Sequence, residues 1–334
     1  MTWLVWRQFR TQAVVATAAL AALGVFLVIT GIQLADYYSS SGLSACYGAC
    51  SGATTNFLNS VANGVTDTAH NLNNGVMYVL PAIVGVFWGA PLIARELEAG
   101  THRLAWNQSV TRRRWLATKL LALGLATIGV AGLVSLMVTW WSSSIDHASM
   151  TMLTPAVFGA RGVVPIGYAA FAFMLGVVAG VVVRRTVPAM AATLAIVVFA
   201  QIAMPLWLRK HLTTPVRETL PLDVNQITNL SSVNNGHMTV QAAASKPGAW
   251  LLSNQTITPS GSVFTGPANM TACNRNTSPE SCINWLGTLH LRQALTYIPQ
   301  SRFWPLQWIE ASIFLALALA LVGVCFWWVR RKVA

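Results

Sequence analysis

The chain has 334 residues, of which 54% are hydrophobic and only 9% are charged. A soluble domain usually carries about 25% charged residues, and the mean hydropathy here is +0.55, so the composition excludes an ordinary soluble protein. The net charge of +12 is, in a membrane protein, more typical of basic residues gathered on the cytoplasmic side than of nucleic-acid binding, and no nucleic-acid partner is expected.

Six apolar segments are long enough to cross a bilayer, which takes roughly 20 residues per helix. Because a spanning segment must satisfy its own backbone hydrogen bonds, each one is predicted to be a helix. Pro81 and Pro91 lie in the second segment and predict a kinked helix there. In chain order, the predicted spans are residues 13–34, 76–94, 115–141, 163–183, 187–208 and 306–329.

The positions of the charges predict the orientation of these spans. If the N-terminus lies inside, most of the 21 lysine and arginine residues fall on the inner side, whereas the two shorter outer segments, 35–75 and 142–162, hold only Arg161. The positive-inside rule therefore places both termini in the cytoplasm. The predicted fold class is an all-α integral membrane protein with six transmembrane helices, N-in and C-in, and an extracytoplasmic subdomain between helices 5 and 6.

Four regions follow from this layout. The first region, residues 1–12, is predicted to form an interfacial amphipathic helix. The equal alternative is a simple basic flank that sets the topology. The outer segment is too long to be a passive link; it is expected to form turns and short strands, and then a helix over 281–298. It could cap the exit, bind a partner or be purely structural. The regions are 1–12, 13–208 with the inner loop 95–114, 209–303, and 304–334 with the basic tail.

Four cysteines fall in predicted outer segments, which favours disulfides in an oxidising compartment. Local pairs are the simplest of the three possible connectivities, but all three stay open. A zinc site is disfavoured because the nearby histidines lack the spacing of metal ligands, so no metal is expected. The four residues are Cys46, Cys50, Cys273 and Cys282.

The inner loop 95–114 is the most informative segment. Glu96 and Glu98 end the second span, and Gly100 suits the position just after a helix. Thr101 can begin a short new helix, and Ser109 or Thr111 can begin the third span. A short helix across the inner mouth could transmit motion from a cytoplasmic partner; the alternative is an ordinary basic loop.

The residues of this loop carry a resemblance. The runs Glu96-Leu97-Glu98-Ala99-Gly100-Thr101 and Ser109-Val110-Thr111-Arg112, with the later Lys119, resemble permease subunits of ATP-binding-cassette exporters of the type 2 class. Those permeases show a Glu, a Gly-Thr pair four residues on, a Pro-Val-Ser-Arg-like turn and a later Lys; Ser109 replaces the usual Pro. Residues 297–305 resemble actinobacterial members in particular.

The resemblance implies a transporter subunit in the bacterial plasma membrane that moves a hydrophobic or amphipathic substrate outward. It implies a cytoplasmic ATP-binding subunit, which carries ATP and Mg, and a second permease copy, expected as a homodimer in the lipid bilayer. The residues expected to couple to the ATPase are Glu96, Glu98, Gly100, Thr101, His102, Arg103, Trp106 and Arg112.

The chain itself is not expected to be an enzyme or to bind a cofactor. A phosphate-binding loop needs Gly-Lys-Ser/Thr, and no lysine here follows a glycine. Two alternatives remain: a secondary transporter, and a membrane sensor or enzyme that acts through the outer segment. A secondary transporter usually places acidic groups in mid-membrane for ion coupling.

Two charges lie inside predicted spans. Glu310 is the single carboxylate within them, and such a group is a functional candidate. It lies only about one turn inside, however, so the favoured interpretation is that it reaches the interface. Lys119 is similarly expected to reach the inner headgroups.

Overall fold

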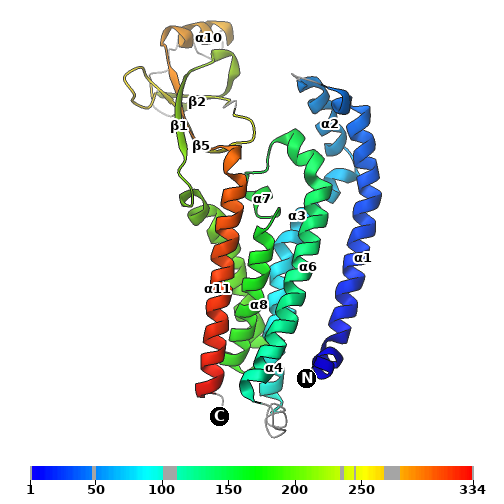
Figure 1. Ribbon diagram of the computed structural model, residues 1–334. Coiled ribbons are helices and arrows are strands. Elements are labelled where there is room, and N and C mark those ends of the chain that lie inside the picture. Colours follow the sequence, from blue (N-terminus) through cyan, green and yellow to red (C-terminus); the bar gives the residue numbers. More distant parts are fainter. Residues whose placement is uncertain are drawn as a thin grey trace. The chain divides into compact units, whose positions relative to one another are not determined.

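The computed structural model describes residues 2–46, 50–100, 111–233, 237–243, 246–266 and 279–332 (Figure 1). The chain divides into two compact units. Unit 1 comprises Met1–Leu212 and Phe303–Ala334, and unit 2 comprises Thr213–Arg302. Each unit is described below by itself.

Unit 1 is a helical bundle (Figure 1). Among the described residues, six continuous helical segments are long and apolar enough to cross a membrane, and each coincides with one of the six predicted spans to within one residue or extends beyond it. Its helices are α1 (Thr2–Ser40), η1 (Leu43–Ala45), α2 (Ser51–Ala62), α3 (Val65–Ile83), η2 (Val84–Gly89), α4 (Ala90–Glu98), α6 (Arg112–Ser149), α7 (Pro155–Phe158), α8 (Val164–Val183), α9 (Thr186–Ala203), η3 (Met204–Leu208), η4 (Arg209–His211) and α11 (Phe303–Lys332).

The N-terminal region differs in one respect from the sequence-based expectation. A separate helix over residues 1–12 was predicted, but α1 is a single helix over Thr2–Ser40. No glycine or proline interrupts the chain between residues 2 and 23, so nothing in the local sequence ends a helix at residue 12.

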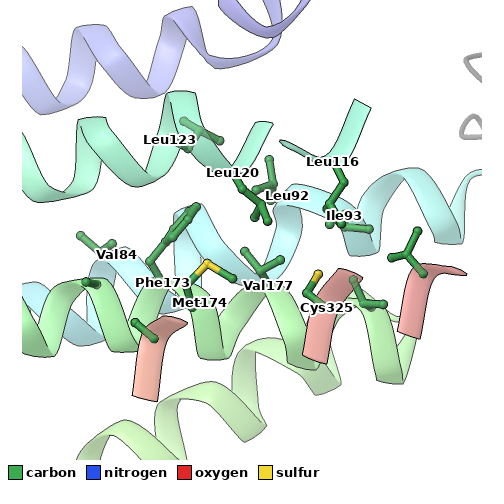
Figure 2. Close-up of a cluster of buried hydrophobic side chains, with 14 of the residues drawn as sticks. Val84, Leu92, Ile93, Leu116, Leu120, Leu123, Phe173, Met174, Val177 and Cys325 are labelled. Carbon is green, nitrogen blue, oxygen red and sulfur yellow. The ribbon is translucent and has the colours of Figure 1, made fainter. Parts of the chain in front are cut away.

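Helix α8 lies at the centre of the bundle. It carries no charged residue, and most of its side chains on every face are buried, as expected for a helix that is apolar all round. Leu92 of α4 and Leu116 of α6 pack with Phe173 and Val177 of α8 in one buried cluster (Figure 2). Since only a small residue permits such close contact, four glycines bring η2, α4 and α8 together: Gly85, Gly89, Gly176 and Gly180.

The second span is irregular where the prolines predicted a kink. Pro81 lies inside α3 and has no N–H to donate to the preceding turn. A π-helix, Val84–Gly89, follows within three residues, and such insertions bend helices. Pro91 lies in the first turn of α4, directly after the π-helix, and it too has no N–H to donate to the preceding turn.

The described part of unit 2 contains two small antiparallel sheets, one α-helix and two short 3-10 helices. One sheet has the strand order β1-β5-β4, and the other pairs β2 with β3. The elements are β1 (Val216–Pro221), η5 (Val224–Gln226), β2 (Ile227–Val233), β3 (His237–Ala242), β4 (Trp250–Ile257), α10 (Pro279–Thr288), β5 (Arg292–Ile298) and η6 (Gln300–Arg302).

The helix predicted over 281–298 is wrong in its second half. Helix α10 ends at Thr288, and Arg292–Ile298 form the central strand β5. Leu295 is buried between its partners Glu218 of β1 and Asn254 of β4. Hydrogen bonds to two neighbouring strands outweigh the weak helical spacing of a short apolar run, which periodicity alone does not separate from a strand.

A half-buried ionic contact joins parts of unit 2. Lys246 Nζ lies 2.7 Å from Glu218 Oε2, and the Tyr297 hydroxyl donates to the same oxygen at 2.8 Å. The hydrogen bond from Lys246, and then that from Tyr297, lower the pKa of the Glu218 carboxyl.

The β1–β5 pairing is therefore expected to weaken in acid. Because the pKa of Glu218 is lowered by folding, the ionised carboxylate stabilises the folded chain at a pH above its unfolded-state pKa of 4.5. This stabilisation is lost as the pH falls through the folded-state pKa. Amide exchange of β5 in the full chain, corrected for intrinsic rates, should show less protection at about pH 3 than at about pH 6. In Glu218→Gln this pH dependence should shrink; an undiminished dependence would contradict the assignment.

Candidate functional site

One end of unit 1 gathers basic residues. At this end, called the basic end, α1, α6 and α9 begin and α4, α8 and α11 finish (Figure 1). Arginines gather there from α1, α4, α6 and α11 and from the turn between α8 and α9: Arg7, Arg10, Arg95, Arg113, Arg114, Arg184, Arg185, Arg330 and Arg331.

The two carboxylates of the inner loop hold neighbouring helices. Glu96 of α4 forms a salt bridge with Lys119 of α6. The Lys119 ammonium also lies 4.8 Å from the centre of the Trp115 ring. Because Lys119 is 2% exposed, the expectation that it reaches the headgroups is wrong: a nearby carboxylate and an aromatic face stabilise its charge inside the bundle.

Glu98 connects α4 to α9. Its Oε2 accepts hydrogen bonds from the backbone N–H of Thr186 at 3.0 Å and from the Thr186 hydroxyl at 2.8 Å. Thr186 is the first residue of α9, where free N–H groups and the helix dipole favour a negative charge. A carboxylate from α4 thus caps α9.

The ends of the inner loop agree with the predicted caps. Gly100 follows α4 with a φ of +68°, the left-handed conformation that glycine adopts most easily. The Thr111 hydroxyl accepts a hydrogen bond from the N–H of Arg114 at 3.3 Å, so Thr111 begins α6. Arg112 is the first residue of α6. The predicted coupling residues Thr101, His102, Arg103 and Trp106 lie outside the described residues.

The opposite end of unit 1 holds a buried ion pair around Glu310 of α11. Arg209 Nε lies 2.7 Å from Glu310 Oε2, and Nη2 lies 2.9 Å from Oε1. The Tyr168 hydroxyl donates to Oε1 at 3.1 Å, and the guanidinium lies 4.5 Å from the Phe158 ring centre. Glu310 is fully buried, so the prediction that it reaches the interface is wrong; a two-pronged Arg pair satisfies it inside the protein.

A second buried pair lies at the same end. Arg161 Nε donates to Asp146 Oδ2 at 2.6 Å, and Nη1 donates to Asn74 at 2.8 Å. The sequence analysis did not predict this pair, because the third predicted span ends before Asp146 and the fourth begins after Arg161. The signal that could have found the pairs is the occurrence of opposite charges, such as Arg209 and Glu310, at the ends of spans that meet on one side of the bilayer.

The cysteines form one described disulfide, between Cys46 and Cys50. Cys282 is also disulfide-bonded, whereas Cys273 lies outside the described residues. Within the described part of the chain, no three His, Cys, Asp or Glu side chains are grouped to hold a metal ion.

A lateral groove completes the features of unit 1. It has a volume of about 1160 Å³ and lies between α1 and the helices α3, η2, α4, α6 and α9. Most of its lining is apolar, and its polar lining residues lie towards the basic end.

Comparison with known families bears directly on these features. The family described as "ABC-2 membrane transporter related" matches residues 17–209, which is more than half of the chain and covers most of the first five spans. No curated protein and no solved structure shows a significant match to the chain. The resemblance to type 2 ATP-binding-cassette permeases is confirmed, and with six helices of spanning length the chain is a multi-pass membrane protein that belongs to the ABC-2 membrane transporter related family.

Proposed function

We propose that this protein is the membrane subunit of an ATP-driven exporter in a bacterial plasma membrane. The family match supports a transport role. The gathering of arginines at one end of unit 1 supports a cytoplasmic basic end, with both termini inside. Unit 2, which connects the far end of α9 to the start of α11, then lies outside the cytoplasm.

In this proposal, a separate cytoplasmic subunit hydrolyses ATP and docks on the loop between α4 and α6. The observation that carries the proposal is that the helix end from which this loop leaves is bonded to two neighbouring helices. Glu96 ties α4 to α6, and Glu98 ties α4 to α9. A force applied to the loop therefore acts on three helices together, as a switch between two packings of the bundle requires.

Glu96 and Glu98 have a revised role in this mechanism. Both were expected to couple to the ATPase, and each carboxylate has a partner inside the chain. We assign to them the transmission of force to α6 and α9. Docking itself is assigned to the loop residues, including Thr101, Arg103 and Trp106.

Two copies of the chain are proposed to form the transporter, with the cargo moving outward along apolar helix faces. Large apolar side chains are exposed on α1, α6, α9 and α11. In a bilayer these faces can contact lipid, cargo or a second copy. They suit a hydrophobic or amphipathic cargo better than a strongly polar one.

The Glu98 contact provides the test. The complex with the ATPase should still form when Glu98 is replaced by alanine, but stimulation of ATP hydrolysis by cargo should fall severalfold, because the two hydrogen bonds that tie α4 to α9 are lost. The measurement is co-purification followed by ATPase assays in reconstituted membranes. Thr186→Ala, which removes one of the two donors, should show a smaller loss.

Asp36→Ala is the matched control, because Asp36 is an exposed carboxylate on α1; it should leave stimulation unchanged. The proposal would be overturned if no ATP-binding subunit co-purified and the chain alone moved solute down an ion gradient. Loss of ATPase binding in Glu98→Ala would instead place Glu98 in the docking surface.

A further inference from the structure

The groove beside α1 has the dimensions of a site for a lipid-sized molecule. Its volume of about 1160 Å³ exceeds the roughly 300–1,000 Å³ of common small-molecule sites. Its α1 wall runs from Thr11 to Leu23, which is about 18 Å at the rise of an α-helix. This length is close to one leaflet, or roughly half of the 30 Å hydrocarbon core.

The chemistry of the groove is asymmetric along its length. The walls formed by residues such as Leu23 and Val79 are apolar, whereas the polar residues Thr11, Gln12 and Thr186 lie at the basic end. Arg95 lies at that end too. Among the described residues that line the groove, it is the single ionisable side chain, and it is exposed.

Gln12 adds a second, independent feature. Its Nε2 donates to the Phe87 carbonyl at 3.4 Å, and Phe87 lies in the π-helix. Its Oε1 is buried and has no hydrogen-bond partner within the described chain. A buried acceptor without a partner is unfavourable, so a rotation of the Gln12 side chain that turns this oxygen into the groove would be favoured when an occupant offers a donor.

On the basis of the function proposed above, we propose that the groove binds one cargo-class molecule, an anionic lipid with a hydroxylated headgroup, taken from the leaflet at the basic end. Arg95 binds the anionic group, and Gln12 Oε1 accepts a hydrogen bond from the headgroup hydroxyl. The acyl chains lie along α1, α3 and η2.

Charge decides between this occupant and a second copy of the chain. An apolar helix of a second copy that filled the groove would bury the Arg95 charge without a partner, which is costly away from water. An anionic headgroup neutralises that charge and remains at the interface. A lipid without net charge would fill the apolar part but leave Arg95 uncompensated.

The test uses the full chain in nanodiscs of phosphatidylcholine, without any partner. Two photoactivatable probes with identical acyl chains, a phosphatidylglycerol and a phosphatidylcholine, are added in turn, and the labelled residues are mapped by mass spectrometry. The phosphatidylglycerol probe is expected to label the groove walls on α1 and α3 about fivefold more than the phosphatidylcholine probe, as one basic side chain near anionic lipid predicts.

Three variants sharpen the result. Arg95→Gln should reduce labelling by phosphatidylglycerol to the level of phosphatidylcholine, whereas Arg113→Gln, an exposed arginine of the basic end outside the groove lining, should not. Gly75→Phe should remove groove labelling by both probes at an unchanged unfolding temperature. Gly75 lines the groove, and a Cβ atom there meets nothing within 4 Å.

The proposal is overturned if both probes label the groove equally, if Arg95→Gln and Gly75→Phe leave labelling unchanged, or if cross-links join the grooves of two copies instead. These results are independent of the ATPase. Labelling as expected with no ATPase partner would sustain the lipid site and overturn the exporter, whereas absent labelling with intact ATPase coupling would do the reverse.

Discussion

Replacing Glu310 with alanine is expected to destabilise unit 1 by about 3–5 kcal/mol, because it leaves the Arg209 charge buried without its partner. Arg209 is only 1% exposed and Glu310 is fully buried, so water cannot replace the lost carboxylate. Tyr168 would also lose the acceptor of its hydroxyl. The thermal unfolding midpoint of the purified chain measures the effect.

A double variant distinguishes an ion pair from simple loss of volume. Arg209→Met combined with Glu310→Leu removes both charges and keeps most of the side-chain volume, so it should be clearly more stable than Glu310→Ala. Glu310→Gln keeps the shape and loses the charge, and should be destabilised. Equal stability of Glu310→Gln and the unsubstituted chain would show that Arg209 does not need a negative partner.

The second large effect is expected at the glycine contact between α8 and the second span. A Cβ atom on Gly176 would lie 2.3 Å from the carbonyl oxygen of Gly85 and 2.7 Å from the N of Ala90. Both neighbours are backbone atoms, which no side-chain rotation can move away. Gly176→Ala should therefore cost about 3 kcal/mol, the upper end of ordinary overpacking, and Gly176→Leu should prevent stable assembly of the bundle.

Gly129→Ala is the matched control for this prediction. Gly129 lies in α6, and a Cβ atom there meets nothing within 4 Å. Alanine favours a helix over glycine by about 1 kcal/mol, so this variant should unfold at the same or a higher temperature. If Gly176→Ala behaved in the same way as Gly129→Ala, the close crossing of α8 would be contradicted.

The six spans could be predicted because a bilayer imposes a length and an apolar composition on each crossing. The same criterion finds only the apolar part of each helix, so α6 extends past the predicted 115–141 to Ser149. Caps were also predictable where a single residue carries the signal: Gly100 has a positive φ and Thr111 begins α6.

The buried charge pairs were not predicted, because the packing of the bundle, and not the local sequence, brings the partners of each pair together. Arg209 of η4 and Glu310 meet only because the segment that continues α9 and the helix α11 bring them to one end of unit 1. Glu98 was expected to couple to the ATPase because of the resemblance to type 2 permeases; its contact with Thr186 depends on the packing of α4 beside α9. Local sequence does not encode such neighbours.

The orientation of the bundle is the central claim, and the accessibility of cysteines substituted for exposed residues tests it most directly. Arg113 lies at the basic end and Ser260 lies in unit 2, and both are exposed. A membrane-impermeant maleimide should label Ser260→Cys in intact cells and Arg113→Cys only after the membrane is permeabilised. Labelling of Arg113→Cys in intact cells would place the basic end outside and contradict both the topology and the ATPase docking that depends on it.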